Sequence, residues 1–364
     1  MSKKYQEIYK LLRQDIQSHE FQNGDKLPSE TEMMEKYSVS RQTVRHALSF
    51  LMADGLIRKA QGSGSFVHYA CATLNTKRIA VLFYDVNNYI FSAMMREIDT
   101  AVYERGYMAS FYSTIGSAEK ERSILRQLIA TPVDGIVFHA SAEHLVCGNM
   151  DLFAQLQKMG TKIIFFSNRY MNPELLQIPL IGSEDYVGAE KITGFLLRQG
   201  HKRIGCFRIF GSLLIDTRFA GVCNALLRCG MPLDEKNYIP VYGRYNQMQI
   251  MNDAAAECLS YADAFICLSA SLFDLLLECF RKYGHGNIRT VVVFDKVKVP
   301  EIKGVEFIVL QYDLCKAALL CAEGILAQIE GEMISSQQLP WLITEDSTAE
   351  TLPTDFEREA AQRE

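Results

Sequence analysis

Long apolar runs are missing from this sequence of 364 residues. No stretch approaches the roughly 18 uninterrupted apolar residues of a membrane span. The first residues, Met1 to Tyr5, are not followed by the apolar core of a secretory signal. Apolar residues make up 48% and charged residues 22%, which is ordinary usage for a soluble protein. We therefore expect a cytoplasmic protein that is neither exported nor anchored in a membrane.

Metal-binding and catalytic motifs are also missing. The ten cysteines never form a C-x-x-C pair, and no Cys or His pair has zinc-ligand spacing. We therefore expect reduced core thiols, no metal and no cofactor. The G-x-S-x-G, G-x-x-x-x-G-K-[ST] and H-E-x-x-H motifs are absent, and Gly62-Ser63-Gly64 lacks the third glycine of a dinucleotide loop. An α/β enzyme therefore has little support, and we expect no catalytic residues.

The net charge of −5 is distributed unevenly along the chain. Residues 1–70 carry ten Lys and Arg against eight Asp and Glu, a balance of +2, whereas residues 71–364 carry −7. This asymmetry permits nucleic-acid binding at the N-terminus without establishing it. The chain is too long for one ordinary core, so we expect two or three folded units.

The first seventy residues predict three helices and a hairpin. A helical apolar stripe, Tyr5, Ile8, Leu12 and Ile16, predicts a first helix that ends near residues 23–25. Ser29 and Glu32 form a capping box that starts a second helix, which should run to about Lys36. Ser40 then caps a third helix that ends at Gly55, with a buried stripe of Val44, Ala47, Leu48 and Leu51.

Two short helices joined by the tight turn at residues 37–39 form a helix-turn-helix. The side chains left off the apolar stripe of the third helix suit the major groove of DNA: Arg41, Gln42, Arg45 and Ser49. The runs 56–59 and 65–68 flank Gln61-Gly62-Ser63-Gly64, which predicts a hairpin whose tip could enter the minor groove. For each arginine the alternative is a surface ion pair with Glu30 or Glu35.

Residues 4–68 resemble the GntR-type DNA-binding domain without a gap. The resemblance is carried by residues 24–30, 39–45 and 55–57, and by Gln61 to Val67. It implies that Arg41 and Arg45 contact guanine edges or phosphates, that Thr43 contacts a phosphate, and that Gln61 and Gly62 reach the minor groove. The full expected DNA-binding set is Lys4, Glu30, Ser40, Arg41, Gln42, Thr43, Arg45, Gln61, Gly62 and Ser63.

From Lys77 onward, apolar runs alternate with helical segments and predict buried parallel strands. The runs are 79–83, 135–138, 162–166, 203–207, 264–267 and 290–294. Five helices should end where a Lys or Arg precedes a glycine within two residues, at Gly106, Gly160, Gly200, Gly230 and Gly284. This alternation predicts an α/β fold, either one barrel or two lobes, with ligands bound beyond the carboxyl ends of the strands.

Residues 77–344 resemble the periplasmic-binding-protein-like effector domain of LacI-type repressors. The resemblance is carried by 181–188, 197–204 and 218–222, and it favours two lobes of doubly wound parallel sheets joined by three crossovers. A GntR-type head on such a body resembles the arabinose-repressor subfamily. We therefore expect a winged helix-turn-helix at 1–69, a linker at 70–76, the effector-binding and dimerisation domain at 77–344 and a polar tail at 345–364.

The resemblance also implies an effector site for a sugar, which needs charged groups and a flat aromatic wall. The expected set is Phe91, His139, Asn168, Arg218, Asp295 and Gln311. Two acidic positions of the family are absent: the chain has Ser167-Asn168 at one and Leu268-Ser269-Ala270 at the other. The alternatives are that Phe91 belongs to the core, that Asp295 caps a loop and that His139 has only a structural role.

The resulting hypothesis is a homodimeric, DNA-binding transcriptional repressor of carbohydrate-utilisation genes. Its partners would be operator DNA and a small sugar or sugar derivative that changes operator affinity, by induction according to the resemblance. The first alternative keeps the DNA-binding head and makes the body a dimerisation scaffold with a non-functional cleft. A second, a pyridoxal-phosphate-binding aminotransferase-like body, would need a longer chain.

Overall fold

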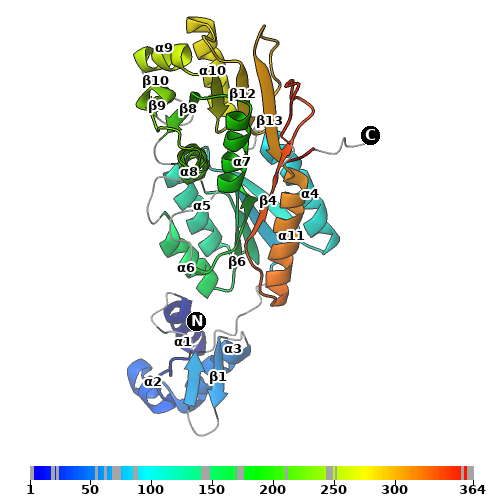
Figure 1. Cartoon of the computed structure of the whole chain (residues 1–364). Coiled ribbons are helices and arrows are strands. Elements are labelled where there is room, and N and C mark those ends of the chain that lie inside the picture. The colour runs from blue at the N-terminus through cyan, green and yellow to red at the C-terminus, as the bar shows by residue number, and fades with distance from the viewer. Residues whose placement is uncertain are drawn as a thin grey trace.

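The computed structural model describes residues 4–17, 21, 24–53, 56–60, 64–67, 75–84, 89–140, 148–167, 169, 176–209, 212–242, 249–250, 252–353 and 356–358. They form a small N-terminal head and a body of two lobes (Figure 1). The head consists of α1 (Lys4–Gln17), α2 (Glu30–Tyr37), α3 (Arg41–Ala53), β1 (Ile57–Ala60) and β2 (Gly64–Val67).

The head has its own core, made by the expected apolar stripes of α1 and α3. The Ser29 and Glu32 capping box is present at α2, and Ser38 leaves that helix in the left-handed conformation. Ser40 Oγ accepts the N–H of Thr43 at 3.3 Å, as expected of the cap of α3. The prediction that the first helix reaches residues 23–25 is wrong, because α1 ends at Gln17, directly after the last buried residue of its stripe.

The wing is an antiparallel hairpin in which Ile57 pairs with Val67. Both side chains belong to the core of the head, so the hairpin is fixed against the helices. Its expected tip, with Gln61, Gly62 and Ser63, lies outside the described residues, as does Gly55 at the expected end of the third helix.

The lobe that follows the head, here called the N lobe, is a parallel sheet in the order β14-β7-β6-β5-β3-β4. Its strands are β3 (Arg78–Phe83), β4 (Met108–Ser113), β5 (Gly135–Phe138), β6 (Lys162–Phe166), β7 (Leu180–Ser183) and β14 (Gln337–Leu339). Alternate residues of β3 pack into two separate cores. The helices α4 (Tyr89–Glu104) and α11 (Leu314–Glu330) cover one face, and α5 (Ala118–Ala130) and α6 (Met150–Lys158) cover the other.

The second lobe, the C lobe, has the order β10-β9-β8-β11-β12-β13-β15-β16, with five parallel strands from β9 to β13. Its strands are β8 (Ile204–Ile209), β9 (Tyr238–Tyr242), β10 (Gln249–Ile250), β11 (Ala264–Cys267), β12 (Thr290–Phe294), β13 (Glu306–Tyr312), β15 (Trp341–Ile343) and β16 (Glu357–Arg358). Its helices are α7 (Asp185–Arg198), α8 (Leu213–Arg228), α9 (Asn252–Tyr261) and α10 (Ala270–Tyr283).

Three chain segments cross between the lobes and lie side by side. The first joins β7 to α7, the second joins β13 to α11, and the third joins β14 to β15. Glu184 donates its N–H to the carbonyl of Leu339 at 2.9 Å, and Trp341 is paired with Tyr312 in the ladder of β13 and β15. These contacts place the third segment between the other two and make the hinge a three-stranded ribbon.

All six predicted strand runs are confirmed as β3, β5, β6, β8, β11 and β12. The five predicted helix-ending glycines all have positive φ, between 69° and 98°. The segment that we expected to be a polar tail contributes β16 and the buried ring of Phe356, both against the C lobe. None of the helices in the described ranges combines the length and apolar composition needed to cross a bilayer.

Candidate DNA-binding and effector-binding sites

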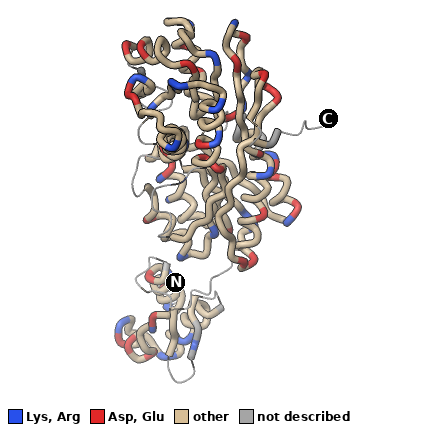
Figure 2. The backbone as a smooth tube through the Cα atoms, viewed as in Figure 1, with Lys and Arg blue, Asp and Glu red and all other residues tan. Residues whose placement is uncertain are grey.

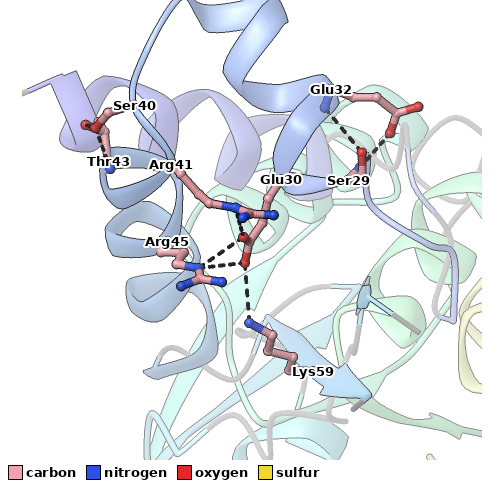
Figure 3. Close-up of polar contacts among 8 residues, drawn as sticks. All are labelled: Ser29, Glu30, Glu32, Ser40, Arg41, Thr43, Arg45 and Lys59. Carbon is pink, nitrogen blue, oxygen red and sulfur yellow. Dashed lines mark hydrogen bonds and ion pairs between the residues drawn. The ribbon is translucent and has the colours of Figure 1, made fainter. Parts of the chain in front are cut away.

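One carboxylate of the head gathers three cationic side chains (Figure 3). Glu30, in the first turn of α2, accepts the Nε–H of Arg41 at 3.1 Å and that of Arg45 at 3.0 Å. Lys59, on β1 of the wing, lies 3.4 Å from the same carboxylate. The cluster therefore joins the second helix, the third helix and the wing at one point.

The Glu30 cluster carries a surplus of two positive charges. Partial burial of Glu30 favours its neutral form, but Arg45 and Lys59 outweigh that effect and lower its pKa. The side chains of Arg41, Arg45 and Lys59 are between 51% and 61% exposed, so their remaining donors stay accessible. In Figure 2 the positions of acidic and basic residues are interspersed along the backbone of the body.

The other expected DNA-binding residues lie beside this cluster or outside the described residues. Lys4, Ser40 and Thr43 line one open groove between the starts of α1 and α3. The hydroxyls of Ser40 and Thr43 are 2.9 Å apart, which leaves each with further hydrogen-bonding capacity toward the surface. Gln42 is exposed at the start of α3. The described candidates therefore lie around the start of the third helix, with Arg41 and Arg45 on the side of Glu30 and with Ser40 and Thr43 on the other side (Figure 3).

The topology of the two sheets marks a crevice in each lobe. In the N lobe the chain passes from β3 to β4 on one side and then to β5 on the other. In the C lobe it passes from β8 to β9 and then to β11. Open α/β sheets bind ligands beyond the carboxyl ends of the strands at such a reversal. His139 directly follows β5 in the N lobe and is an expected effector residue. Leu268 directly follows β11 at the corresponding place in the C lobe.

Arg218 is the centre of a buried charged cluster at the hinge. Its side chain is 2% exposed. Its Nε donates to Asp185 at 2.8 Å, its Nη1 donates to the carbonyl of Leu268 at 2.6 Å, and Nη1 lies 3.8 Å from Asp295. The guanidinium also lies 4.6 Å from the centre of the Trp341 ring. Arg218 is therefore held by groups from the start of α7, from the residues that follow β11 and β12, and from the first residue of β15.

Asp295 supports this cluster from a strained backbone position. Its φ is +78°, and its carboxylate accepts the N–H of Ala270 at 3.3 Å, at the start of α10. Burial raises the pKa of Asp295, and the neighbouring Arg218 opposes that shift. Ser269 uses its hydroxyl to cap α10.

The expected aromatic wall of the N lobe is packed into the core. Phe91 is 5% exposed and stacks on Phe83 with ring centres 4.8 Å apart. His139 meets Phe91 edge-on at 5.2 Å. Burial lowers the pKa of His139 to about 4, so its imidazole is neutral at pH 7. The ring of Phe91 is therefore part of the core, and this side of the site offers the uncharged ring of His139. Asn168 lies outside the described residues.

Two of the expected effector residues have a buried polar atom without a hydrogen-bond partner in the described structure. These atoms are Nδ1 of His139, after β5 in the N lobe, and Oε1 of Gln311, at the carboxyl end of β13. Tyr312, next to Gln311, is hydrogen-bonded to Ser167 after β6 and so links the two lobes. Buried polar atoms are nearly always paired, so such exceptions call for a missing partner.

A cavity of about 140 Å³ opens between the lobes beside the hinge. Ser167 and Gly182 contribute from the N lobe, Asp185 from the first crossover, and Leu213 and Thr217 from α8. Asp185 connects this cavity with the Arg218 cluster. Asp185 and the Leu268 carbonyl are not among the effector-site residues expected from the sequence. Asp185 lies in segment 181–188, which carries the family resemblance, but an ion pair across 33 positions leaves no local signal.

Comparisons with known protein families agree with this arrangement. Residues 4–67 match the model of bacterial regulatory proteins of the gntR family. Residues 76–311 match the model of periplasmic binding proteins and the sugar binding domain of the LacI family. The chain belongs to the latter family, with a GntR-type DNA-binding head, and is a DNA-binding regulator rather than an enzyme.

The chain is similar over its whole length to a particular kind of regulator. It is 25% identical over 360 residues, 95% of this chain and 98% of the relative, to the arabinose metabolism transcriptional repressor of Geobacillus stearothermophilus. Among solved structures, a LacI family regulator of Enterococcus faecium with bound ribose has a TM-score of 0.59, with 20% identity, over 76% of this chain and 99% of that one. The CelR–cellobiose complex has a TM-score of 0.60, with 18% identity, over 84% and 90%.

Proposed function

We propose that this protein is a dimeric repressor of carbohydrate-utilisation genes, and that a small sugar bound between its lobes changes its affinity for operator DNA. The observation that carries the effector part is the pair of unpartnered polar atoms, His139 Nδ1 and Gln311 Oε1. They come from opposite lobes and lie at carboxyl ends of strands. Hydroxyl groups of a sugar can donate to both atoms and restore the hydrogen bonds that burial has removed.

The DNA-binding part of the proposal rests on the Glu30 cluster. Its arginines use Nε for the carboxylate, and in Figure 3 the terminal amino groups of Arg45 point away from Glu30. A guanidinium that is already fixed loses less conformational freedom when it donates to a guanine or a phosphate. We therefore assign Arg41 and Arg45 to the major groove, with Glu30 as the residue that positions them.

The dimer is supported by an exposed edge of the N lobe. β4 is the edge strand of its sheet, and Met108 at its start is 70% exposed. Tyr103, in the last turn of α4, is 75% exposed. An exposed sheet edge with large apolar side chains favours association. One winged module also buries only about 600–1,000 Å² on DNA, and specific regulators usually double that area.

The effector proposal is tested by removing the two unpartnered atoms. Purified wild type is screened by thermal shift with arabinose, ribose, xylulose and cellobiose. In His139→Leu and Gln311→Leu we expect the sugar-dependent shift to disappear while the melting temperature without sugar stays equal or rises, because an unsatisfied buried group is removed. Thr344→Val is the matched control. It removes an unpartnered buried hydroxyl directly after β15 in the C lobe.

Two outcomes would count against this assignment. If the leucine variants keep a wild-type sugar response, the effector is held by other groups. If no compound changes either the melting temperature or operator affinity of the wild type, the body is a dimerisation scaffold. For a responsive protein we expect operator affinity to change by about 5- to 150-fold, the usual range of allosteric coupling.

A further inference from the structure

A single buried carboxylate holds the point at which the chain enters the N lobe after the head. Asp134 is 1% exposed. Its Oδ1 accepts the N–H of Thr76 at 2.9 Å and the hydroxyl of Thr76 at 2.8 Å, and its Oδ2 accepts the N–H of Lys77 at 2.9 Å. Lys77 has a φ of +54°, and its ammonium lies 4.4 Å from the centre of the Tyr107 ring. The last residues before β3 are therefore fixed to the body.

Strand β5 connects Asp134 to the candidate effector site. Asp134 precedes β5, and His139 follows it, so the four fully buried residues of β5 separate them. At about 3.3 Å per residue, the two positions are roughly 16 Å apart. The backbone of Asp134 also bonds to the carbonyl of Arg78 and the N–H of Lys162, both at 2.9 Å. One strand of a rigid sheet thus joins the attachment of the head to the effector wall.

The C lobe contains the same arrangement with a different attachment. Asp263 precedes β11 and accepts the N–H groups of Lys202 at 3.2 Å and Arg203 at 3.3 Å, the residues that precede β8. Its backbone bonds to Arg203 and Arg289 in the same pattern. There the carboxylate holds a loop within the body. In the N lobe it holds a segment whose other end is the DNA-binding head.

We infer that Asp134 is the positioning residue that transmits movement of the N lobe to the head, through Thr76 and Lys77. This inference rests on the proposed function, because it concerns how lobe movement would set the separation of two heads on DNA. Rigid elements that connect two sites carry coupling between them. Without the carboxylate, the segment that leads from the N lobe toward the head is no longer held to the sheet by side-chain hydrogen bonds.

The test compares Asp134→Asn with Asp263→Asn in the full-length chain. Asparagine keeps one acceptor but presents an amino group to the second N–H, so each variant weakens the hold on the backbone in its own lobe. Asp263→Asn also changes the contact with His201 Nδ1 at 3.2 Å and the ion pair with Arg203 at 3.7 Å, so it is the more disruptive of the two variants within the body. Half-sites are first selected from random DNA with the wild type and then paired at spacings that differ by single base pairs. Spacing dependence is measured as the Kd at the least favourable spacing divided by the Kd at the most favourable one. We expect this ratio to fall by about threefold or more in Asp134→Asn, and to stay at the wild-type value in Asp263→Asn.

Equal spacing dependence in the two variants would overturn the inference. Should Asp134→Asn fail to fold, Thr76→Val removes one bond and is expected to reduce the ratio in the same direction, and no reduction counts against the role of the clamp. Should the wild type show no spacing dependence, the dimeric proposal fails. Small-angle X-ray scattering without DNA still tests the clamp, because only Asp134→Asn should broaden the distribution of distances between head and body.

Discussion

The head and the hinge each contain a charged cluster, and the two have opposite compositions. In the head one carboxylate, Glu30, holds two arginines and a lysine, which leaves an exposed surplus of positive charge. At the hinge one arginine, Arg218, is held by two carboxylates and a carbonyl and is almost fully buried. In the first cluster the positive charges outnumber the one carboxylate that they contact. In the second, carboxylates of the protein itself balance the charge of the arginine.

This difference indicates which kind of partner each cluster suits. An exposed positive surplus attracts a polyanion such as DNA, and its contribution depends on salt. A buried arginine between two carboxylates has no charge left for an anion, but it fixes the walls of a site in which hydroxyl groups can bind. The same residue type thus suits DNA binding in one place and supports the architecture of the hinge in the other.

Arg218→Ala should have the largest effect on stability. It leaves Asp185 and Asp295 buried without their counter-charge, and breaking a buried pair in this way costs about 3–5 kcal/mol. The control is Arg208→Ala in the same lobe, because its partner Asp216 is 37% exposed and the pair is far more accessible to water. Urea denaturation measures both variants. If Arg218→Ala lowers the free energy of unfolding no more than Arg208→Ala does, the two carboxylates of the hinge do not depend on Arg218 as their counter-charge.

The second prediction concerns His139, the uncharged counterpart of Arg218 on the opposite lobe. Its pKa is about 4 in the folded protein and near 6.5 when unfolded, so the unfolded chain binds the proton first as the pH falls. Stability is therefore retained above pH 6.5 and lost toward pH 4, by at most about 3 kcal/mol at 1.36 kcal/mol per pKa unit. Denaturation series between pH 7 and 4 should show a shallower loss in His139→Leu, and identical slopes would contradict the buried neutral ring.

Arg41→Ala and Arg45→Ala should leave stability unchanged and weaken DNA binding. An arginine that reads a base edge contributes about 1–3 kcal/mol of specific binding. An arginine that contacts only phosphate would instead weaken all sequences alike and lower the salt dependence by about one unit. Arg13→Ala, on α1, is the control because Arg13 pairs with Tyr9 at the surface of the head. Wild-type operator affinity in both variants would exclude this placement of the third helix.

Glu30→Gln should lower the stability of the head by less than about 1 kcal/mol, because the partners of Glu30 are mostly exposed. The three cations lose their common anchor while the head gains one positive charge. Affinity for random DNA should therefore rise, and the ratio of operator to random binding should fall. Anisotropy titrations with both kinds of DNA measure the ratio, which stays constant if Glu30 serves only to start α2.

Much of the architecture could be predicted from the sequence because local patterns determine it. The buried parallel strands are short apolar runs, and the capping box at Ser29 is a four-residue signal. The edge strand β4 was missed because Ser110 and Ser113 interrupt its apolar residues and leave no continuous apolar run. The three-residue strands β14 and β15 are too short to show any period.

The candidate sites were predictable as residue types and not as contacts. Arg41, Arg45 and Arg218 were selected from the sequence, but their partners come from distant positions. Asp185 is 33 residues from Arg218, and Asp134 is 58 residues from Thr76. Such pairs depend on the order of strands in the sheet, which a single sequence does not encode locally. The family resemblance indicated which residues belong to the candidate sites, but it did not indicate which hydrogen bonds and ion pairs join them.

The three crossover segments determine how the lobes can move. Since Glu184 bonds to Leu339 and Trp341 pairs with Tyr312, the segments form one flat ribbon rather than three independent tethers. A flat ribbon resists twisting and sliding within its plane but bends easily about a line across it. We therefore expect the lobes to rotate easily about one axis only, the line across the ribbon. A ligand bound between them would then change only the angle between the lobes.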